Sequence, residues 1–313
     1  MDFKVFIDGE AGTTGLKVAE RLQAHPHVQI LRVGAAERKN AAARADMMAA
    51  SDVTILCLPD EAAVGAVTLA QASQTRLIDA SSAHRIDPDW VYGFAELQPG
   101  QRDAIANGKL ITNPGCYPTG FLALARPLIA SGLLSDTALV CAPAVSGYSG
   151  GGKAMIAKHD AGDLHPAFSY GSNLQHKHLG EMTLYSGLKT PPIFMPSVGD
   201  FYAGMLVHMP LHADQIEGSA TAAMIYDCLA DRYHGSALVR MGAAAANHAD
   251  VPPMLAADAL AGRNDMELFV FSDAAEQRFW LTARLDNLGK GASGAAVQNM
   301  NIALGLDDHF GLN

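Results

Sequence analysis

Cys116 has the sequence setting of a nucleophilic thiol. It stands in NPGCYPTG, residues 113–120, between an expected strand and an apolar helix through 121–129. Pro118 suits a first helical turn, where a missing N–H costs nothing. Unpaired N–H groups at the beginning of a helix stabilise a thiolate. We therefore expect Cys116 to attack an activated acyl group and hold it as a thioester.

The other cysteines lack this setting. Cys57 and Cys141 lie in apolar strand patterns, and Cys228 lies in a helix with apolar periodicity. We expect all three to be core thiols. The four cysteines are far apart and form no CxxC pair, so neither a metal site nor a disulfide framework is expected.

A glycine-rich turn, GEAGTTG over residues 9–15, follows the first expected strand and opens a helix. Glycine lets the backbone approach a pyrophosphate, and a helix N-terminus supplies N–H donors. The spacing is GxxGxxG rather than GxGxxG, so a plain strand–helix turn is the alternative. We expect the turn to bind a dinucleotide through these residues: Gly9, Gly12, Thr13, Thr14 and Gly15.

The segment after the second expected strand bears on the choice of cofactor. The strand ends in small, uncharged residues, where an NAD-preferring fold usually has an acid. Arg38 and Lys39 follow and suit a 2′-phosphate, which favours NADP, whereas Glu37 would favour NAD. With a nicotinamide nearby, the thioester on Cys116 accepts hydride, and the thiohemiacetal collapses to an aldehyde.

The first part of the chain alternates strand and helix. We expect strands at 3–8, 28–33, 53–58, 77–80 and 110–112, and a helix at 14–24 with Leu16, Ala19 and Leu22 on one side. This alternation predicts a Rossmann-type parallel sheet covered on both faces, an α/β fold.

The pattern changes after residue 135. Expected strands follow at 138–142, 192–197, 203–210, 267–272 and 279–286, with one clear helix at 219–234. Residues 243–261, rich in Ala and Pro, are expected to form an irregular arm, and 292–306 a last helix. Strands without helices between them predict a second, α+β domain with a mostly antiparallel sheet.

Composition excludes several classes of function. The chain has 313 residues, 49% of them hydrophobic, and a formal net charge of −10. The negative charge argues against a nucleic-acid partner, and no apolar run is long enough for a membrane span. The N-terminus, MDFKVFIDGEAG, enters a strand without a signal-peptide pattern. We expect a cytoplasmic enzyme acting on a small molecule.

Taken together, NPGCYPT, GEAGTTG and DNLGKGASGAAVQNMN resemble the N-acetyl-gamma-glutamyl-phosphate reductases of the aspartate-semialdehyde dehydrogenase superfamily. The resemblance runs along the whole chain, and DASSAHR, YGFAEL and HKHLGEM are similar to the shorter, second type. It implies NADPH-dependent reduction of N-acetyl-glutamyl 5-phosphate to the 5-semialdehyde and phosphate, a step of arginine biosynthesis. Aspartyl phosphate or a carrier-linked aminoadipyl derivative is the alternative substrate, and a non-catalytic nucleotide sensor is the alternative class.

The resemblance also implies an acid/base histidine, His176 or His178, in the HxHxxE stretch. A group with a pKa near 7 suits the deprotonation of a thiol. If the stretch is helical, Glu181 shares a face with His178 and can orient it, which slightly favours His178. A third metal ligand is not apparent, so we expect no metal.

Substrate-binding positions carry over from the same resemblance. Ser82 and Arg85, in DASSAHR beside Ser81, suit an acyl phosphate or a carboxylate, and a helix cap with a surface arginine is the alternative. Ser146, Gly147 and Lys153 stand in a glycine-rich loop, SGYSGGGK, that the resemblance places at the substrate and nicotinamide region. A flexible surface loop is the alternative.

A second glycine-rich segment, 287–294, contains Asn287 and Gly291, and the resemblance implies that it contacts the nicotinamide end of the cofactor. The dinucleotide-binding domain would then comprise 1–115 and 288–313. Residues 116–287 would form the catalytic and oligomerisation domain. Relatives associate through the antiparallel sheet, so we expect a homodimer or homotetramer.

Overall fold

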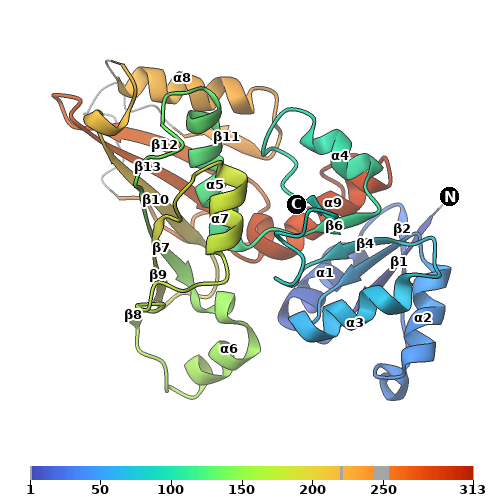
Figure 1. Cartoon of the computed structure of the whole chain (residues 1–313). Helices are drawn as coiled ribbons and strands as arrows, with labels where there is room; N and C mark the ends of the chain where they lie inside the picture. Colours follow the sequence, from blue (N-terminus) through green and yellow to red (C-terminus); the bar gives the residue numbers. More distant parts are fainter. Residues whose placement is uncertain (1, 219–220, 243–253, 313) are drawn as a thin grey trace. The chain divides into compact units, whose positions relative to one another are not determined.

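The computed structural model describes residues 2–218, 221–242 and 254–312. These residues form two compact units. The first comprises residues 1–95, 100–114 and 292–313, and the second comprises residues 96–99 and 115–291. Figure 1 shows the C-terminal helix, in red, among the elements of the first unit, which are otherwise blue to blue-green. The first unit is therefore assembled from distant parts of the chain.

The described part of the first unit contains a six-stranded sheet in the order β2-β1-β3-β4-β6-β5. Each of its strand pairs is parallel, as the alternating pattern predicts. Its strands are β1 (Phe3–Asp8), β2 (Val28–Leu31), β3 (Val53–Leu56), β4 (Arg76–Asp79), β5 (Val91–Tyr92) and β6 (Leu110–Thr112).

Helices of this unit fall into two groups. They are α1 (Thr13–Gln23), α2 (Ala41–Ala50), α3 (Asp60–Ala70), α4 (Gln101–Asn107) and α9 (Gly294–Ala303). Helix α9 contacts α1 and α4, whereas α2 contacts α3. Phe6 and Leu56 of the sheet pack with Met48 of α2 and Ala66 of α3 in one buried cluster. Strand β1 contacts both α1 and α2, one helix from each group, as expected of a doubly wound fold. Within α1, the expected apolar side was partly wrong, because Leu16 is exposed.

The described part of the second unit contains a seven-stranded sheet in the order β11-β12-β13-β10-β7-β9-β8. Its pairs are antiparallel except β7/β9 and β11/β12, which are parallel. The expectation of a mostly antiparallel sheet is confirmed. Its strands are β7 (Cys141–Gly147), β8 (Ala167–Ser169), β9 (Ile193–Gly199), β10 (Met205–His212), β11 (Val239–Met241), β12 (Met266–Ser272) and β13 (Arg278–Leu285).

Among the residues that the structure describes, the α-helices of the second unit are α5 (Cys116–Ala130), α6 (Gly152–Asp160), α7 (Leu179–Ser186) and α8 (Ala222–Tyr233). The apolar helix α5 packs on β10 and β13 and also contacts α7 and α8. The side chains of β13 alternate accordingly, with Leu281 and Ala283 buried and Trp280 47% exposed. The expectation of one clear helix among the strands after residue 135 was wrong, since α6 and α7 are present as well as α8. Most of the expected arm, 243–253, lies outside the described residues.

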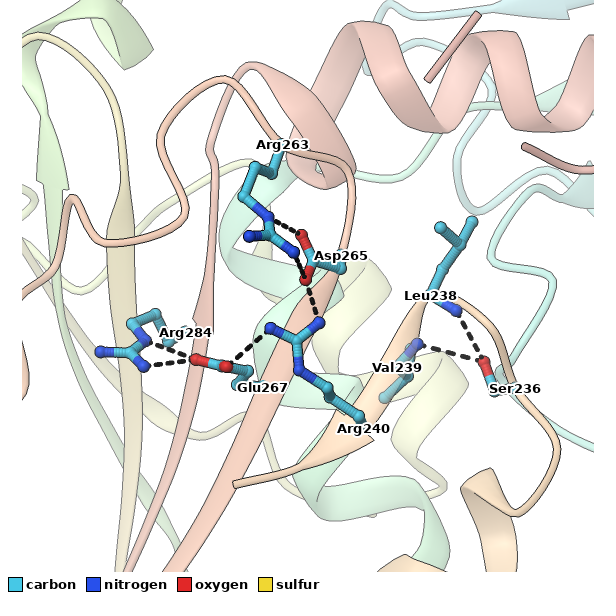
Figure 2. Close-up of polar contacts among 8 residues, drawn as sticks. All are labelled: Ser236, Leu238, Val239, Arg240, Arg263, Asp265, Glu267 and Arg284. Carbon is cyan, nitrogen blue, oxygen red and sulfur yellow. Dashed lines mark hydrogen bonds and ion pairs between the residues drawn. The ribbon is translucent and has the colours of Figure 1, made fainter. Parts of the chain in front are cut away.

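Ion pairs tie the β11 edge of this sheet together (Figure 2). Arg240, Glu267 and Arg284 stand directly opposite one another on β11, β12 and β13. Glu267 accepts from Arg240 Nη2 at 2.7 Å and from Arg284 Nε at 2.9 Å. Asp265 bridges Arg240 and Arg263, and these bonds lower the pKa of its carboxyl. Opposite charges at facing positions favour this register over a slipped one.

Candidate active site

The glycine turn of the first unit leaves no room for side chains at two of its positions. Gly9 has a φ of +92°, and a Cβ there would lie 2.4 Å from the carbonyl oxygen of Cys57. A Cβ on Gly15 would lie 2.4 Å from the carbonyl oxygen of Gly9. Gly12 precedes α1 without a side chain that could cap the helix. The turn therefore presents bare backbone at a helix N-terminus, which suits an anion.

A cavity of about 370 Å³ lies beside this turn. Asp8, Gly9 and Glu10 line it, together with Arg38 and Lys39 from the segment after β2. The residues expected to hold a 2′-phosphate thus face the same cavity as the turn. This combination of glycine turn, helix N-terminus and basic lining fits the adenosine and phosphates of a dinucleotide.

Cys116 is the first residue of α5, as predicted, and it is partly exposed. Gly115 precedes the helix in an extended conformation. Its N–H donates to Glu181 Oε2 at 3.0 Å, and its carbonyl accepts from the Thr119 hydroxyl at 2.8 Å. The backbone beside the thiol is therefore held from both sides. The acceptor of the Gly115 N–H is the carboxylate of Glu181, which is fully shielded from solvent.

The remaining cysteines differ from Cys116 in their surroundings, although none of them is as fully buried as the expectation of core thiols implies. Burial raises the pKa of Cys57 to about 12, with further contributions from Asp79 and Asp8. Burial also raises the pKa of Cys228. Neither thiol begins a helix, so neither has the environment that activates a nucleophile.

Both candidate histidines lie close to the residue that follows the thiol. The ring of Tyr117 lies 6.0 Å from that of His178, which lies 4.5 Å from that of His176. The ring centroids of Tyr170 and His176 lie 5.8 Å apart. Burial raises the pKa of Tyr170 to about 12, and the charge of Cys116 adds to this increase. Cys116, His176 and His178 thus share one neighbourhood in the second unit.

The two histidines differ in hydrogen bonding and burial. His178 is 6% exposed and immediately precedes α7, whereas His176 is half-buried. The Nδ1 atom of His176 accepts the backbone N–H of His178 at 3.1 Å. A ring nitrogen that accepts this bond carries no proton, so neutral His176 bears its proton on Nε2.

Sequence reasoning missed a buried ion pair next to the thiol. Lys290 is 1% exposed, and its Nζ lies 2.8 Å from both carboxylate oxygens of Glu96. It belongs to a π-helical turn, Gly289–Ser293. A Cβ on the next residue, Gly291, would lie 2.7 Å from the Cβ of Cys116. Gly291 therefore packs directly against Cys116, and Lys290 precedes it in the same π-helical turn.

Asn287 is engaged by the second unit itself. Its Oδ1 accepts the N–H of Gly204 at 2.8 Å, and its Nδ2 donates to the Ser149 hydroxyl at 3.0 Å. The residue therefore joins the end of β13 to the segments before β10 and after β7. Its expected role at the cofactor stays a prediction.

Residues 146–153 do not form the single loop that the sequence predicts. Strand β7 lies further along the chain than expected, so Ser146 and Gly147 are its last residues rather than loop residues. A Cβ on Gly147 would lie 2.5 Å from the carbonyl oxygen of Tyr202. A short 3₁₀ turn and α6 follow, and Lys153 is exposed on α6. The boundary was misplaced because Pro143 interrupts the apolar pattern within the strand.

Ser82 and Arg85 lie in the first unit, whereas Ser146, Gly147 and Lys153 lie in the second. The hydroxyl of Ser82 donates to Asp60 Oδ2 at 2.7 Å, which ties the segment after β4 to the first turn of α3. Arg85 is buried and donates to the carbonyl of Ala80. The alternative of a surface arginine was therefore wrong.

The described residues contain no group of three or more His, Cys, Asp or Glu side chains that could hold a metal ion. Among the described helices, none combines the length and apolar character needed to cross a membrane.

Comparisons with known structures show the fold. An aspartate semialdehyde dehydrogenase from Francisella tularensis matches with a TM-score of 0.70 at 17% identity, covering 96% of this chain and 99% of that one. Another, with NADP, from Candida albicans matches with a TM-score of 0.64 at 13% identity, covering 96% and 98%. The expected fold class, a parallel-sheet domain with a second α+β domain, is confirmed.

Comparisons with known sequences show the family. Residues 4–107 match the semialdehyde dehydrogenase NAD binding domain, and residues 116–287 match the semialdehyde dehydrogenase dimerisation domain. A relative from Trichormus variabilis named N-acetyl-gamma-glutamyl-phosphate reductase is 47% identical, covering 99% of both chains. A relative of the same name from Brucella ovis is 48% identical, covering 96% of this chain and 99% of its own. The chain therefore belongs to the N-acetyl-gamma-glutamyl-phosphate reductase family, as its motifs predict.

Proposed function

We propose that this protein reduces N-acetyl-glutamyl 5-phosphate to N-acetylglutamate 5-semialdehyde and phosphate with NADPH, a step of arginine biosynthesis. The proposal rests mainly on the position of Cys116. Its thiol is partly exposed at the beginning of α5, and His176 and His178 lie in its neighbourhood. The name of the curated relatives supplies the substrate. The first unit serves as the dinucleotide-binding domain and the second as the catalytic domain.

The cofactor's binding residues follow from the glycine turn and the cavity beside it. Gly9, Gly12 and Gly15 bring bare backbone to the pyrophosphate, and Arg38 and Lys39 hold the 2′-phosphate. Thr13 and Thr14 add hydroxyl donors. Asn287 and Gly291 serve the nicotinamide end. When bound, NADPH supplies the hydride for reduction of a thioester.

The reaction begins with transfer of the thiol proton of Cys116 to His178. We assign the base to His178 because Nδ1 of His176 already accepts a backbone N–H and Nε2 carries the proton. The thiolate forms a bond to the acyl carbon, the C–O bond to phosphate breaks, and His178 returns the proton to the departing phosphate. After reduction, the thiohemiacetal anion expels the Cys116 thiolate as the aldehyde forms, and the thiolate takes up a proton from solvent.

The substrate's phosphate and carboxylate require cationic and polar partners. Arg85 and Ser82 from the first unit, and Ser146, Gly147 and Lys153 from the second, are the proposed partners. The Ser82 hydroxyl already donates to Asp60. Ser82 would therefore contribute by positioning the segment after β4 rather than by binding the substrate with a free hydroxyl.

We further propose a homodimer or homotetramer, located in the cytoplasm, that forms through the exposed face of the second sheet. Trp280, Ile193, Met195 and Leu139 are large apolar side chains with substantial exposure in this unit. Ile193 and Met195 lie on the same exposed side of β9, and contiguous apolar surface of this kind favours association. A single monomeric species in light scattering would contradict this association.

An assay with purified protein tests the proposed function in the direction of oxidation. N-acetylglutamate 5-semialdehyde, aspartate semialdehyde and aminoadipate semialdehyde are each supplied with NADP and phosphate, and NADPH absorbance is followed. The proposal predicts turnover with the N-acetylglutamate compound and at least about 100-fold lower kcat/KM with the others, a typical result when a site pairs polar substrate groups. Faster turnover of either of the other two would overturn the substrate assignment.

A further inference from the structure

We propose that Arg44 gives the nucleotide cavity its preference for NADP(H) by holding Asp8, a carboxylate that would otherwise repel the 2′-phosphate. The inference rests on the proposed function, since it takes the cavity beside the glycine turn to hold the adenosine half of the cofactor. Arg44 is thus a specificity-determining residue that acts through its neighbour.

Asp8 brings an acid to the cavity itself. It is the last residue of β1, it is only 4% exposed, and it lines the cavity next to Gly9. Its backbone is fixed by the sheet edge, because its carbonyl accepts the N–H of Cys57 at 2.7 Å. The backbone that carries this carboxylate is therefore held at the cavity.

Arg44 occupies both oxygens of this carboxylate. Its Nε lies 3.1 Å from Oδ1 and 3.1 Å from Oδ2 of Asp8, and its Nη2 lies 2.7 Å from Oδ2. The guanidinium comes from α2, also lines the cavity, and is largely shielded from solvent. A bidentate arginine satisfies the carboxylate and cancels its charge at close range.

The other acids of this region are also occupied. Glu10, which lines the cavity, accepts from Arg32 Nε at 3.0 Å. Glu37, whose carboxylate would favour NAD, accepts from the Asn40 amide at 2.6 Å and does not line the cavity. Asn40 is itself fixed, since its Oδ1 caps the first turn of α2. Among the described residues that line the cavity, both carboxylates, Asp8 and Glu10, are thus paired with an arginine.

The balance of charge in the cavity depends on Arg44. Its lining contains three cations, Arg38, Lys39 and Arg44, and two carboxylates, Asp8 and Glu10. Within the described residues, neither Arg38 nor Lys39 forms an ion pair with an acid, so both are available to an anion. Without Arg44 the lining would have no excess of positive charge. Asp8 would repel a 2′-phosphate and could accept the 2′-hydroxyl of NAD(H) instead.

The test is a set of titrations with NADPH and with NADH, followed by nucleotide fluorescence in the absence of acyl substrate. We compare the unchanged protein with Arg44→Met, Asp8→Asn and the double variant. In Arg44→Met, the ratio of the NADH to the NADPH dissociation constant should fall by at least about tenfold, because like charges are brought together. The double variant should recover most of that ratio, and Asp8→Asn alone should keep or increase it.

The matched control is Arg102→Met, which removes an arginine from an exposed ion pair with Asp308 in the same unit, outside the cavity lining. Its selectivity should stay within about twofold, since screened surface charges act weakly. Equal weakening of both nucleotides in Arg44→Met, or no recovery in the double variant, would overturn the proposal. The titrations contain no semialdehyde, so a failed substrate assignment leaves their outcome unaffected.

Discussion

Glu181 accepts the backbone N–H of Gly115 at 3.0 Å, although the two residues are 66 positions apart. The bond joins the first turn of α7 to the residue that immediately precedes Cys116. Because α7 begins directly after His178, one short segment contains both the proposed base and the residue that holds the backbone before the nucleophile. The HxHxxE stretch thus has a structural link to the thiol that its spacing alone does not reveal.

Two replacements of Glu181 should distinguish the contribution of this hydrogen bond from that of the carboxylate charge. In Glu181→Leu the N–H of Gly115 loses its acceptor, and we expect a loss of about 1–3 kcal/mol in the free energy of unfolding. Glu181→Gln retains an acceptor oxygen and should lose less than half as much. Chemical denaturation measures both values. Equal stability of the leucine and glutamine variants would contradict the proposed bond.

Replacing each of the two histidines in turn by asparagine should distinguish their roles. His178→Asn removes the proposed base and should lower kcat by about 10²–10⁴-fold, the usual contribution of general base catalysis. His176→Asn keeps an acceptor near the position of Nδ1 and should lower kcat by less than about tenfold. Single-turnover acylation rates provide the measurement. A larger loss in His176→Asn would reverse the assignment.

The buried pair of Lys290 and Glu96 should be costly to break from one side. Lys290→Met leaves a carboxylate in a largely buried position without its cation, so we expect a loss of about 3–5 kcal/mol. Combining Lys290→Met with Glu96→Gln removes both charges and should recover a large part of that loss. Urea unfolding of the single and double variants tests this coupling. Additive losses would show that the pair has no special role.

Acid should weaken the second unit through His208. Burial lowers the pKa of His208, and its Nδ1 accepts from Trp280 Nε1 at 3.0 Å, a bond that a protonated ring cannot accept. A histidine whose folded pKa is lowered binds its proton more readily when unfolded. Its contribution to stability is therefore complete above the unfolded pKa of about 6.5 and is lost as pH falls below it.

The corresponding variant is His208→Asn, which keeps an acceptor for Trp280 but does not titrate. Its melting temperature should fall less between about pH 6.5 and 5 than that of the unchanged protein. His234→Asn, at an exposed position, is the control and should retain the original slope. Parallel melting curves for His208→Asn and the unchanged protein would contradict the role of His208.

Local signals in the sequence predicted much of the first unit and of the thiol site. Strand β1 and its glycine turn were predictable because a continuous apolar run ends at Gly9, and α5 because Pro118 and an apolar run follow Cys116. Strand β7 was misplaced because buried and partly exposed side chains alternate through Pro143 and hide its true end. Resemblance to a known family supplied the histidines and the substrate.

Two of the contacts that sequence reasoning missed are long-range. Lys290 meets Glu96 across 194 positions, and Arg44 meets Asp8 across 36. A lone lysine or arginine in a sequence is typical of a solvated surface, and only the fold shows that these two are shielded and paired with carboxylates. Such pairs are set by tertiary packing, which no local pattern encodes.

A covalent thioester on Cys116 is the central claim, and its formation without phosphate tests it most directly. Semialdehyde and NADP are mixed rapidly with the enzyme, NADPH is followed in the first turnover, and the quenched protein is mapped by mass spectrometry. We predict a burst of about one NADPH per site, an N-acetylglutamyl adduct on Cys116, and neither in Cys116→Ser. Continuous turnover without a burst, or an adduct on Cys57, Cys141 or Cys228 instead, would contradict it.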